Sequence, residues 1–297
     1  MRLAGTFAAA ICLLAGAATA QTTQPAAHRL YLWDNPPGVV AGPDTDTDPT
    51  VPTMDVYLPD HPNGAAVIIF PGGAYVHLST VREGSDVAHL LNSHGIAGFV
   101  VRYRHAPRYQ YPIPMLDARR AIRTVRSEAE QFQVDPHRIG IMGFSAGGHL
   151  AATVATQFDG GDPDATDPID RVSSRPDFAV LLYPVITFTQ EKYVHKGSRK
   201  SLLGTRQELW PALSAELHVG PGTPPVFLVH ATTDTTVPVE NSILFYMACR
   251  NAGVSAEMHI FAIGRHGFGL APTDPALRVW PELMLAWMDK NHWLGSH

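Results

Sequence analysis

Short runs of apolar residues alternate along this chain with segments of helical spacing. The runs are apolar at consecutive positions, and several end at proline, glycine or a polar turn. Strands that are apolar throughout must be covered on both faces, which is typical of parallel sheets. The pattern therefore predicts an α/β fold with a mostly parallel sheet and helices on both faces. The predicted strands occupy residues 65–70, 96–101, 139–142, 178–183, 226–230 and 257–262.

Helices are predicted between these strands by apolar residues spaced three and four apart. They occupy residues 81–94, 115–132, 238–251 and 275–292, and one more follows the strand at 139–142. A long irregular segment, residues 185–209, interrupts the alternation, and such segments usually shape a pocket. It is polar, carries several lysines and shows no apolar face, so we expect no separate lid domain.

Two segments precede the alternating pattern. Residues 1–20 combine Arg2, an alanine-rich apolar run and the small-residue sequence Ala18-Thr19-Ala20, which is typical of a cleaved signal peptide. The apolar run is too short for a stable membrane anchor. Residues 21–52 are predicted as an extended N-terminal arm, followed by an edge strand at 54–58. We therefore expect a periplasmic or secreted bacterial protein, without membrane contact after cleavage, whose folded domain covers residues 53–297.

Composition and charge exclude several classes of partner. The net charge is −5 and becomes more negative if Arg2 leaves with the signal, and no basic run is present, so no nucleic-acid partner is expected. The histidines are scattered, without H-x-H, H-E-x-x-H or C-x-x-C motifs, and the acidic residues at 44–48 lack the glycine and distal glutamate of a calcium loop. The sequence therefore predicts no metal site and no cofactor. Removal of the signal leaves Cys249 alone, which excludes an internal disulfide.

The strongest candidate for chemistry is the serine in Gly143-Phe144-Ser145-Ala146-Gly147. An apolar strand precedes this G-x-S-x-G motif, and a small-residue helical pattern follows it at once. Such a strand–turn–helix strains the serine backbone and exposes its hydroxyl, while the glycines let the two elements approach each other. We therefore predict that Ser145 is a nucleophile.

A serine hydroxyl needs a base to remove its proton, and that imidazole needs a carboxylate to orient it. After a turn of this type, the partners follow in the order acid, then histidine. Asp234 follows the strand at 226–230, and His266 lies in a glycine-rich turn after the last strand. We therefore predict a Ser145–His266–Asp234 triad. Asp274 is the rival acid, but it comes after the histidine.

An oxyanion hole needs two N–H donors where negative charge develops. Ala146, directly after the nucleophile, is predicted to supply one of them. The turn after the strand at 65–70 is predicted to supply the other, from Gly73 or Ala74.

Several motifs together resemble a known family. They are Pro71-Gly72-Gly73-Ala74-Tyr75, Gly143-Phe144-Ser145-Ala146-Gly147-Gly148-His149-Leu150-Ala151, Asp234 with Val237-Pro238, and His266-Gly267-Phe268-Gly269, with further likeness at 195–199 and 202–204. Over about residues 53–292 the chain resembles the α/β-hydrolase esterases, and it looks most similar to the small bacterial carbohydrate esterases of acetyl xylan and feruloyl esterase type. The family pattern is changed at two positions. Thr233 stands where relatives often carry a second aspartate, and Arg265 replaces a glycine beside the histidine.

The resemblance implies the α/β-hydrolase fold and an exported serine esterase that removes acetyl groups from hemicellulose such as xylan through an acyl-enzyme. Its partner would be an acylated plant cell-wall polysaccharide or oligosaccharide. A feruloyl esterase or a general short-chain carboxylesterase is the alternative. Two alternatives remain. One is a serine peptidase, because prolyl peptidases share the fold, but that family normally carries an additional propeller domain, which is absent at this length. The other is a non-catalytic binding protein of this fold, but such proteins usually lack a triad member.

Other aromatic and charged residues are candidates for substrate contacts. Tyr75 and Arg199 are the two that we place at the substrate; for Arg199, an interaction that ties its own loop to the sheet is the competing interpretation. His149, Tyr183 and Trp210 could also stack on sugars, but core packing is the expected role of such residues, and His149 is expected to be packed and hydrogen-bonded.

Overall fold

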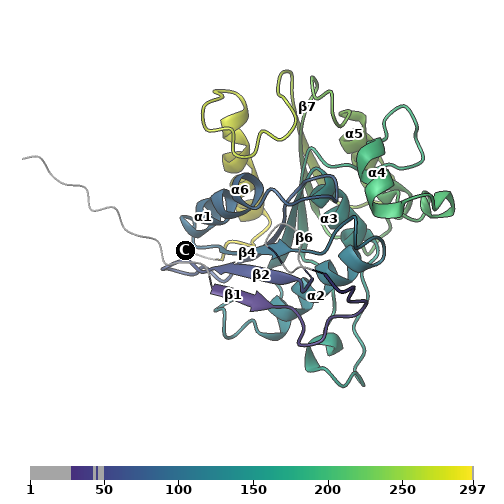
Figure 1. The fold of residues 1–297 in the computed structure, drawn as a ribbon. Coiled ribbons are helices and arrows are strands. Elements are labelled where there is room, and N and C mark those ends of the chain that lie inside the picture. Colours follow the sequence, from purple (N-terminus) through teal and green to yellow (C-terminus); the bar gives the residue numbers. More distant parts are fainter. Residues whose placement is uncertain (1–27, 43–44, 46–49, 296–297) are drawn as a thin grey trace, which may run out of the picture.

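The computed structural model describes residues 28–42, 45 and 50–295, so the predicted signal peptide and most of the acidic segment at 44–48 lie outside the described residues. Its core is an eight-stranded sheet in the order β1-β2-β4-β3-β5-β6-β7-β8 (Figure 1). β1 and β2 pair antiparallel, and every neighbouring pair from β4 to β8 is parallel. The predicted α/β fold with a mostly parallel sheet is confirmed. The strands are β1 (His28–Tyr31), β2 (Thr53–Tyr57), β3 (Ala66–Phe70), β4 (Ala97–Arg102), β5 (Ile139–Phe144), β6 (Phe178–Leu182), β7 (Val226–Ala231) and β8 (Ala256–Phe261).

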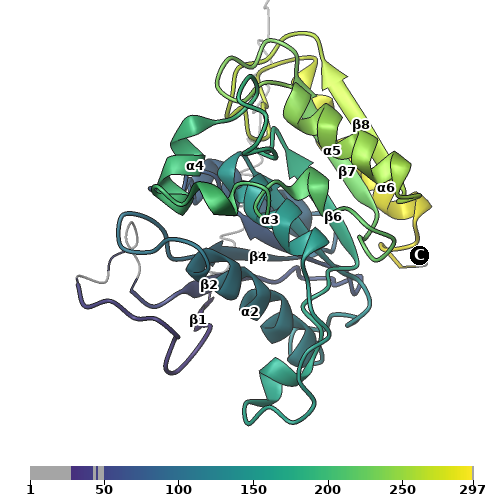
Figure 2. The same ribbon diagram turned by 90° about the vertical axis from the view of Figure 1, so that its right-hand side faces the viewer.

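Helices cover both faces of the sheet (Figures 1 and 2). On one face, α2, α3, α4 and α5 contribute to a single apolar cluster; on the other, α1 and α6 form a second cluster with the opposite sides of the same strands. The helices are α1 (Asp86–Asn92), α2 (Ile113–Ser127), α3 (Ala146–Thr156), α4 (Lys196–Leu203), α5 (Glu240–Asn251) and α6 (Trp280–Lys290). Short helical turns are η1 (Val81–Ser85), η2 (Pro168–Arg171), η3 (Gln207–Leu209), η4 (Ala215–Leu217) and η5 (Leu277–Val279).

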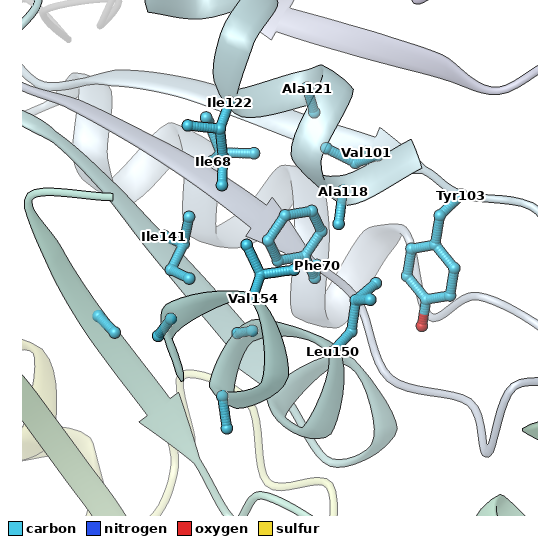
Figure 3. Packing of buried hydrophobic residues seen from close by; sticks show 14 of the residues in the cluster. Ile68, Phe70, Val101, Tyr103, Ala118, Ala121, Ile122, Ile141, Leu150 and Val154 are labelled. Carbon is cyan, nitrogen blue, oxygen red and sulfur yellow. The ribbon is translucent and has the colours of Figure 1, made fainter. Parts of the chain in front are cut away.

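Alternation along each strand divides its side chains between the two clusters. In β3, Ile68 and Phe70 face α2 and α3, whereas Val67 and Ile69 belong to the opposite cluster. Figure 3 shows the first cluster, in which side chains of α2 and α3 pack onto β3 and β5. Burying one such aliphatic or aromatic side chain contributes about 1.5–3 kcal/mol. This two-sided burial is why the strands are apolar at consecutive positions.

The predicted edge strand at residues 54–58 is not at the edge of the sheet. β2 is not an edge strand, because β1 pairs with its outer side. Asp55 in β2 holds this pairing together by accepting from Arg29 of β1 at 2.7 Å and from Arg102 of β4 at 2.9 Å. β1 is only four residues long and mostly exposed, so it carries no hydrophobic signal that the sequence could reveal.

The segment 185–209 also differs from its prediction. It contains α4, and five of its apolar residues are fully buried in the first cluster, while Val194 and Leu209 pack against this cluster and are partly buried. The five are Val185, Ile186, Phe188, Leu202 and Leu203. The prediction of a segment without an apolar face is therefore wrong. The sequence did not show this face, because the buried residues lie at the two ends of the segment and polar residues separate them. Folding brings the ends together, and the exposed lysines are left on the outer side. Within the described ranges, no helix is long and apolar enough to cross a bilayer.

Candidate active site

The predicted strand–turn–helix is present at Ser145. β5 ends at Phe144, and α3 begins at Ala146, with Ser145 at φ 52° and ψ −116° between them. This positive φ is strained for a residue with a Cβ. Only glycine fits at the two flanking positions, because any side chain would clash with the backbone. A Cβ on Gly147 would lie 2.0 Å from the carbonyl oxygen of Phe70, and a Cβ on Gly143 would lie 2.2 Å from the carbonyl oxygen of Gly147. Local packing therefore holds Ser145 at the carboxyl edge of the sheet.

The three predicted triad residues meet at this edge. His266 Nε2 lies 2.7 Å from Ser145 Oγ, and His266 Nδ1 lies 2.7 Å from Asp234 Oδ2. Since a carboxylate only accepts, Nδ1–H donates to Asp234, which leaves Nε2 as the acceptor for the Ser145 hydroxyl. This tautomer is the one that a general base needs. The arrangement can therefore move a proton from Ser145 to His266 when Ser145 attacks a carbonyl.

Asp234 is buried and heavily hydrogen-bonded. Its Oδ1 accepts from the backbone N–H groups of Thr236 and Val237, both at 2.9 Å. Burial raises the pKa of Asp234, but the nearby edge of the His230 ring and the hydrogen bonds from His266 and the Val237 N–H outweigh burial and hold this pKa well below its ordinary value. Asp234 therefore stays ionised throughout the pH range in which a histidine base titrates.

A second imidazole, His230, supports Asp234 and was not predicted. It is fully buried at the end of β7, with Nε2 3.0 Å from the Val237 carbonyl and 3.5 Å from Asp234 Oδ2. Its Nδ1 lies 2.8 Å from the hydroxyl of Ser242 on α5. Because Nε2–H must donate to the carbonyl, the partly positive edge of the ring faces the carboxylate. In the sequence, His230 is only the last residue of an apolar run, which gives no sign of this contact.

The two turns predicted to supply the oxyanion hole lie beside Ser145. A Cβ on Gly72 would lie 3.0 Å from Ser145 Cβ, which shows how closely the turn after β3 packs against the nucleophile. Gly73 has φ 138°, and its carbonyl accepts from the N–H groups of Val76 and His77. In the part of the chain that the structure describes, the N–H groups of Gly73, Ala74 and Ala146 have no hydrogen-bond partner. These donors are therefore available to a negative oxygen beside Ser145.

The two candidate substrate contacts both interact with other residues of the protein. Tyr75 is fully buried, and its hydroxyl lies 2.8 Å from His149 Nδ1, so its interpretation as a substrate contact is wrong. Arg199 donates to the carbonyl of Phe188 and to Glu191, and its guanidinium lies 3.7 Å from the ring centroid of Trp210. It therefore ties residues of its own segment to one another and to Trp210, whereas the competing interpretation predicts a connection from this segment to the sheet. Both side chains are engaged in interactions within the protein.

The buried aromatic candidates have packing roles. His149 donates from Nε2 to the Leu213 carbonyl, accepts from Tyr75 and stacks on Phe188, and burial lowers the pKa of His149 to about 4. Its predicted packed, hydrogen-bonded role agrees with these contacts. Tyr183 is also fully buried.

Contacts define the roles of two further candidates, Thr233 and Asp274, whereas Arg265 lies at the surface. Thr233 accepts from the N–H of Gly264 at 2.9 Å and donates to its carbonyl at 3.0 Å, so it joins the aspartate turn to the histidine turn. Arg265 is exposed. Asp274, the rival acid, accepts from the N–H groups of Ala276 and Leu277 as a turn cap. Asp234 is therefore the carboxylate that contacts His266.

A buried glutamate, Glu83 in η1, also belongs to the site and was not predicted. It is 4% exposed and accepts from the Gly72 N–H and the Tyr183 hydroxyl, each at 2.9 Å. One signal was available in the sequence: Glu83 precedes Val87 and Leu91 at intervals of four, and both of these face the core. Elsewhere, among the residues with described positions, no group of three or more His, Cys, Asp or Glu side chains could hold a metal ion.

Comparison with known proteins gives consistent matches. The family model BD-FAE matches residues 54–248. An acetylxylan esterase of Xylanibacter ruminicola is 37% identical over 222 residues, which cover 73% of this chain and 43% of that protein. Endo-1,4-beta-xylanase B of Butyrivibrio fibrisolvens is 34% identical over 228 residues, which cover 74% of this chain and 35% of that protein. This chain therefore matches less than half the length of either relative.

A solved structure extends the likeness to nearly the whole chain. The acetyl ester-xyloside bifunctional hydrolase from Caldicellulosiruptor lactoaceticus is 43% identical in sequence, with a TM-score of 0.85. The similarity covers 93% of this chain and 100% of that one.

Proposed function

This chain belongs to the BD-FAE family of α/β-hydrolase esterases, and from that premise we propose that it is an exported serine esterase that removes acetyl groups from hemicellulose such as xylan. The observation that carries the proposal is the hydrogen-bonded series Ser145–His266–Asp234 beside the unpaired N–H groups of two turns. The names of the relatives favour an acetyl ester on a xylan-type polymer. Export rests on the sequence of residues 1–20.

The proposed reaction proceeds in two halves. Ser145 Oγ attacks the ester carbonyl carbon while His266 Nε2 takes the hydroxyl proton, and the carbonyl oxygen becomes an oxyanion held by the N–H of Ala146 with that of Gly73 or Ala74. The tetrahedral intermediate collapses, and the sugar oxygen leaves with the proton from His266. Water then attacks the acetyl-Ser145 ester with His266 again as base, which releases acetate and restores the hydroxyl. Asp234 stabilises the imidazolium in both halves.

The proposal is tested by measuring acetate and ferulate release side by side. The substrates are acetylated xylan, acetylated xyloglucan and arabinoxylan, and a Ser145→Ala sample serves as the blank. We expect acetate release from acetylated xylan to exceed ferulate release from arabinoxylan. Dominant ferulate release would instead support the feruloyl esterase alternative. Hydrolysis of a proline p-nitroanilide faster than of any acetyl ester would show that the protein is a serine peptidase.

The length of the acyl chain gives a second prediction. The exposed residues of segment 185–209 include Lys192, Lys196 and Lys200, whereas its apolar residues are buried or partly buried against the first cluster, so an extended apolar surface for docking on lipid is not presented there. We expect kcat/KM to fall by about tenfold or more from acetyl to octanoyl p-nitrophenyl esters, because a pocket sized for acetyl, as the proposed specificity requires, accommodates added methylenes only with strain. Kinetics with the two- to eight-carbon series measure this. A profile that rises towards octanoyl would point to a general carboxylesterase.

A further inference from the structure

The carboxylate of Glu83 lies between the two turns that complete the active site. A Cβ on Gly72 would meet Glu83 Oε2 at 2.7 Å, the Phe144 carbonyl oxygen at 2.8 Å and Ser145 Cβ at 3.0 Å. On the other side, a Cβ on Gly267, the residue after His266, would lie 3.9 Å from Glu83 Oε1. Glu83 is thus packed against backbone that adjoins both the nucleophile and the base.

Hydrogen bonds through Glu83 join these two turns. Oε2 accepts from the Gly72 N–H, directly before the proposed oxyanion donors, and Oε1 accepts from the Tyr183 hydroxyl, each at 2.9 Å. The Tyr183 oxygen in turn accepts from the Gly269 N–H at 3.1 Å, and the Gly269 carbonyl accepts from Trp280 Nε1–H at 2.9 Å. A continuous series of hydrogen bonds therefore runs from the oxyanion turn to the histidine turn.

The charged and titratable groups around Glu83 come from four elements. They are Tyr183 after β6, Tyr103 after β4, His266 in the histidine turn, and Arg82 in η1 itself. Burial is the largest effect and leaves the pKa of Glu83 raised above its ordinary value, while the hydrogen bonds from Tyr183 and Gly72, together with His266 and Arg82, act in the opposite direction. Two donors directed at the two carboxylate oxygens suit the ionised form. A negative charge here favours the imidazolium that His266 becomes during the reaction.

We propose that Glu83 is a positioning residue for the serine-esterase reaction proposed above, on which this inference rests. Its carboxylate fixes the oxyanion turn through Gly72 and the histidine turn through Tyr183 and Gly269, and its charge stabilises protonated His266. If either turn were displaced, the enzyme would lose much more stabilisation of the transition state than affinity for the substrate. Glu83 itself contacts neither the scissile ester nor the Ser145 hydroxyl.

Two substitutions test the two parts of this role. Glu83→Gln keeps the shape and one acceptor but removes the charge, and Tyr183→Phe keeps the charge but breaks the connection to Gly269. With p-nitrophenyl acetate we expect kcat to fall by about tenfold in each variant, with KM within about twofold. Since both act through one series of hydrogen bonds, the double variant should lose much less than the product of the single losses.

The pH profile distinguishes positioning from a purely structural role. Without the Glu83 charge, the imidazolium is less favoured, so the acid limb of kcat/KM should move to lower pH by about half a unit or more in Glu83→Gln. Tyr183→Phe retains the charge and should shift less. Asp86→Asn is the matched control, because it removes a carboxylate charge from the adjacent, exposed first turn of α1. Its acid limb should stay in place.

The outcomes separate this inference from the proposed function. A kcat within about twofold of wild type in both variants, together with an unmoved acid limb in Glu83→Gln, would overturn the positioning role. So would a loss of activity that matches the loss of fluorophosphonate-titratable folded enzyme. If Glu83→Gln does not fold, Tyr183→Phe, which introduces no polar group, decides alone through its kcat. A wild-type protein inactive on p-nitrophenyl acetate would reject the esterase function itself.

Discussion

Replacing Ser145 with alanine is expected to lower kcat for p-nitrophenyl acetate by about 10⁴-fold or more, because no other hydroxyl of the described residues is held against His266 Nε2. The fold should survive. The Ser145 hydroxyl bonds only to His266 among the described residues, and alanine places the same Cβ in the same strained backbone. Steady-state kinetics combined with circular dichroism measure both parts of this expectation.

A fluorophosphonate probe supplies the control for this substitution. Wild type should be labelled at Ser145, and the alanine variant should not be labelled. Substantial residual turnover by a correctly folded Ser145→Ala protein would exclude Ser145 as the nucleophile. Absence of labelling in the wild type would support the alternative of a non-catalytic binding protein with this fold.

The triad could be predicted from sequence because each member follows the carboxyl end of an apolar strand. In a parallel sheet these ends lie at one edge, so Ser145 after β5, Asp234 after β7 and His266 after β8 must lie near one another. Their order in the sequence (serine, acid, histidine) and the G-x-S-x-G turn at Ser145 then indicate which residue is the nucleophile, which the acid and which the base. Prediction succeeds here because the relevant geometry is a property of the sheet and of its strand order.

The supporting residues could not be predicted in this way, because their roles depend on which way a side chain points. Glu83 reaches Tyr183, which lies 100 residues away in sequence, and Tyr75 turns inward to His149 instead of outward to substrate. Arg199 illustrates the same limit: the sequence allows contact with substrate or with its own segment, and only the positions of Glu191 and Trp210 decide. The local sequence pattern does not determine which distant residues each of these side chains contacts.

Replacing Asp234 with asparagine is expected to lower kcat by about 10⁴-fold, although the fold is retained. The asparagine Oδ1 can still accept from the Thr236 and Val237 N–H groups, but Nδ2 would then face His266 Nδ1 as a donor. His266 would have to accept there and carry its proton on Nε2, where it cannot take the proton of Ser145. Kinetics with p-nitrophenyl acetate measure this loss. A kcat above about 1% of wild type would contradict the role of Asp234.

The same substitution should change how stability depends on pH, and Asp274→Asn provides the matched control. A carboxyl whose pKa is lowered by folding stabilises the native state above its unfolded pKa, near 4, and loses that contribution as pH falls towards its folded pKa. The difference in Tm between wild type and Asp234→Asn should therefore be largest near neutral pH and shrink below about pH 4. Asp274→Asn keeps an oxygen that can cap Ala276 and Leu277 and should leave kcat within about twofold of wild type. If Asp274→Asn instead shows the large loss of kcat, Asp274 rather than Asp234 is the acid of the triad.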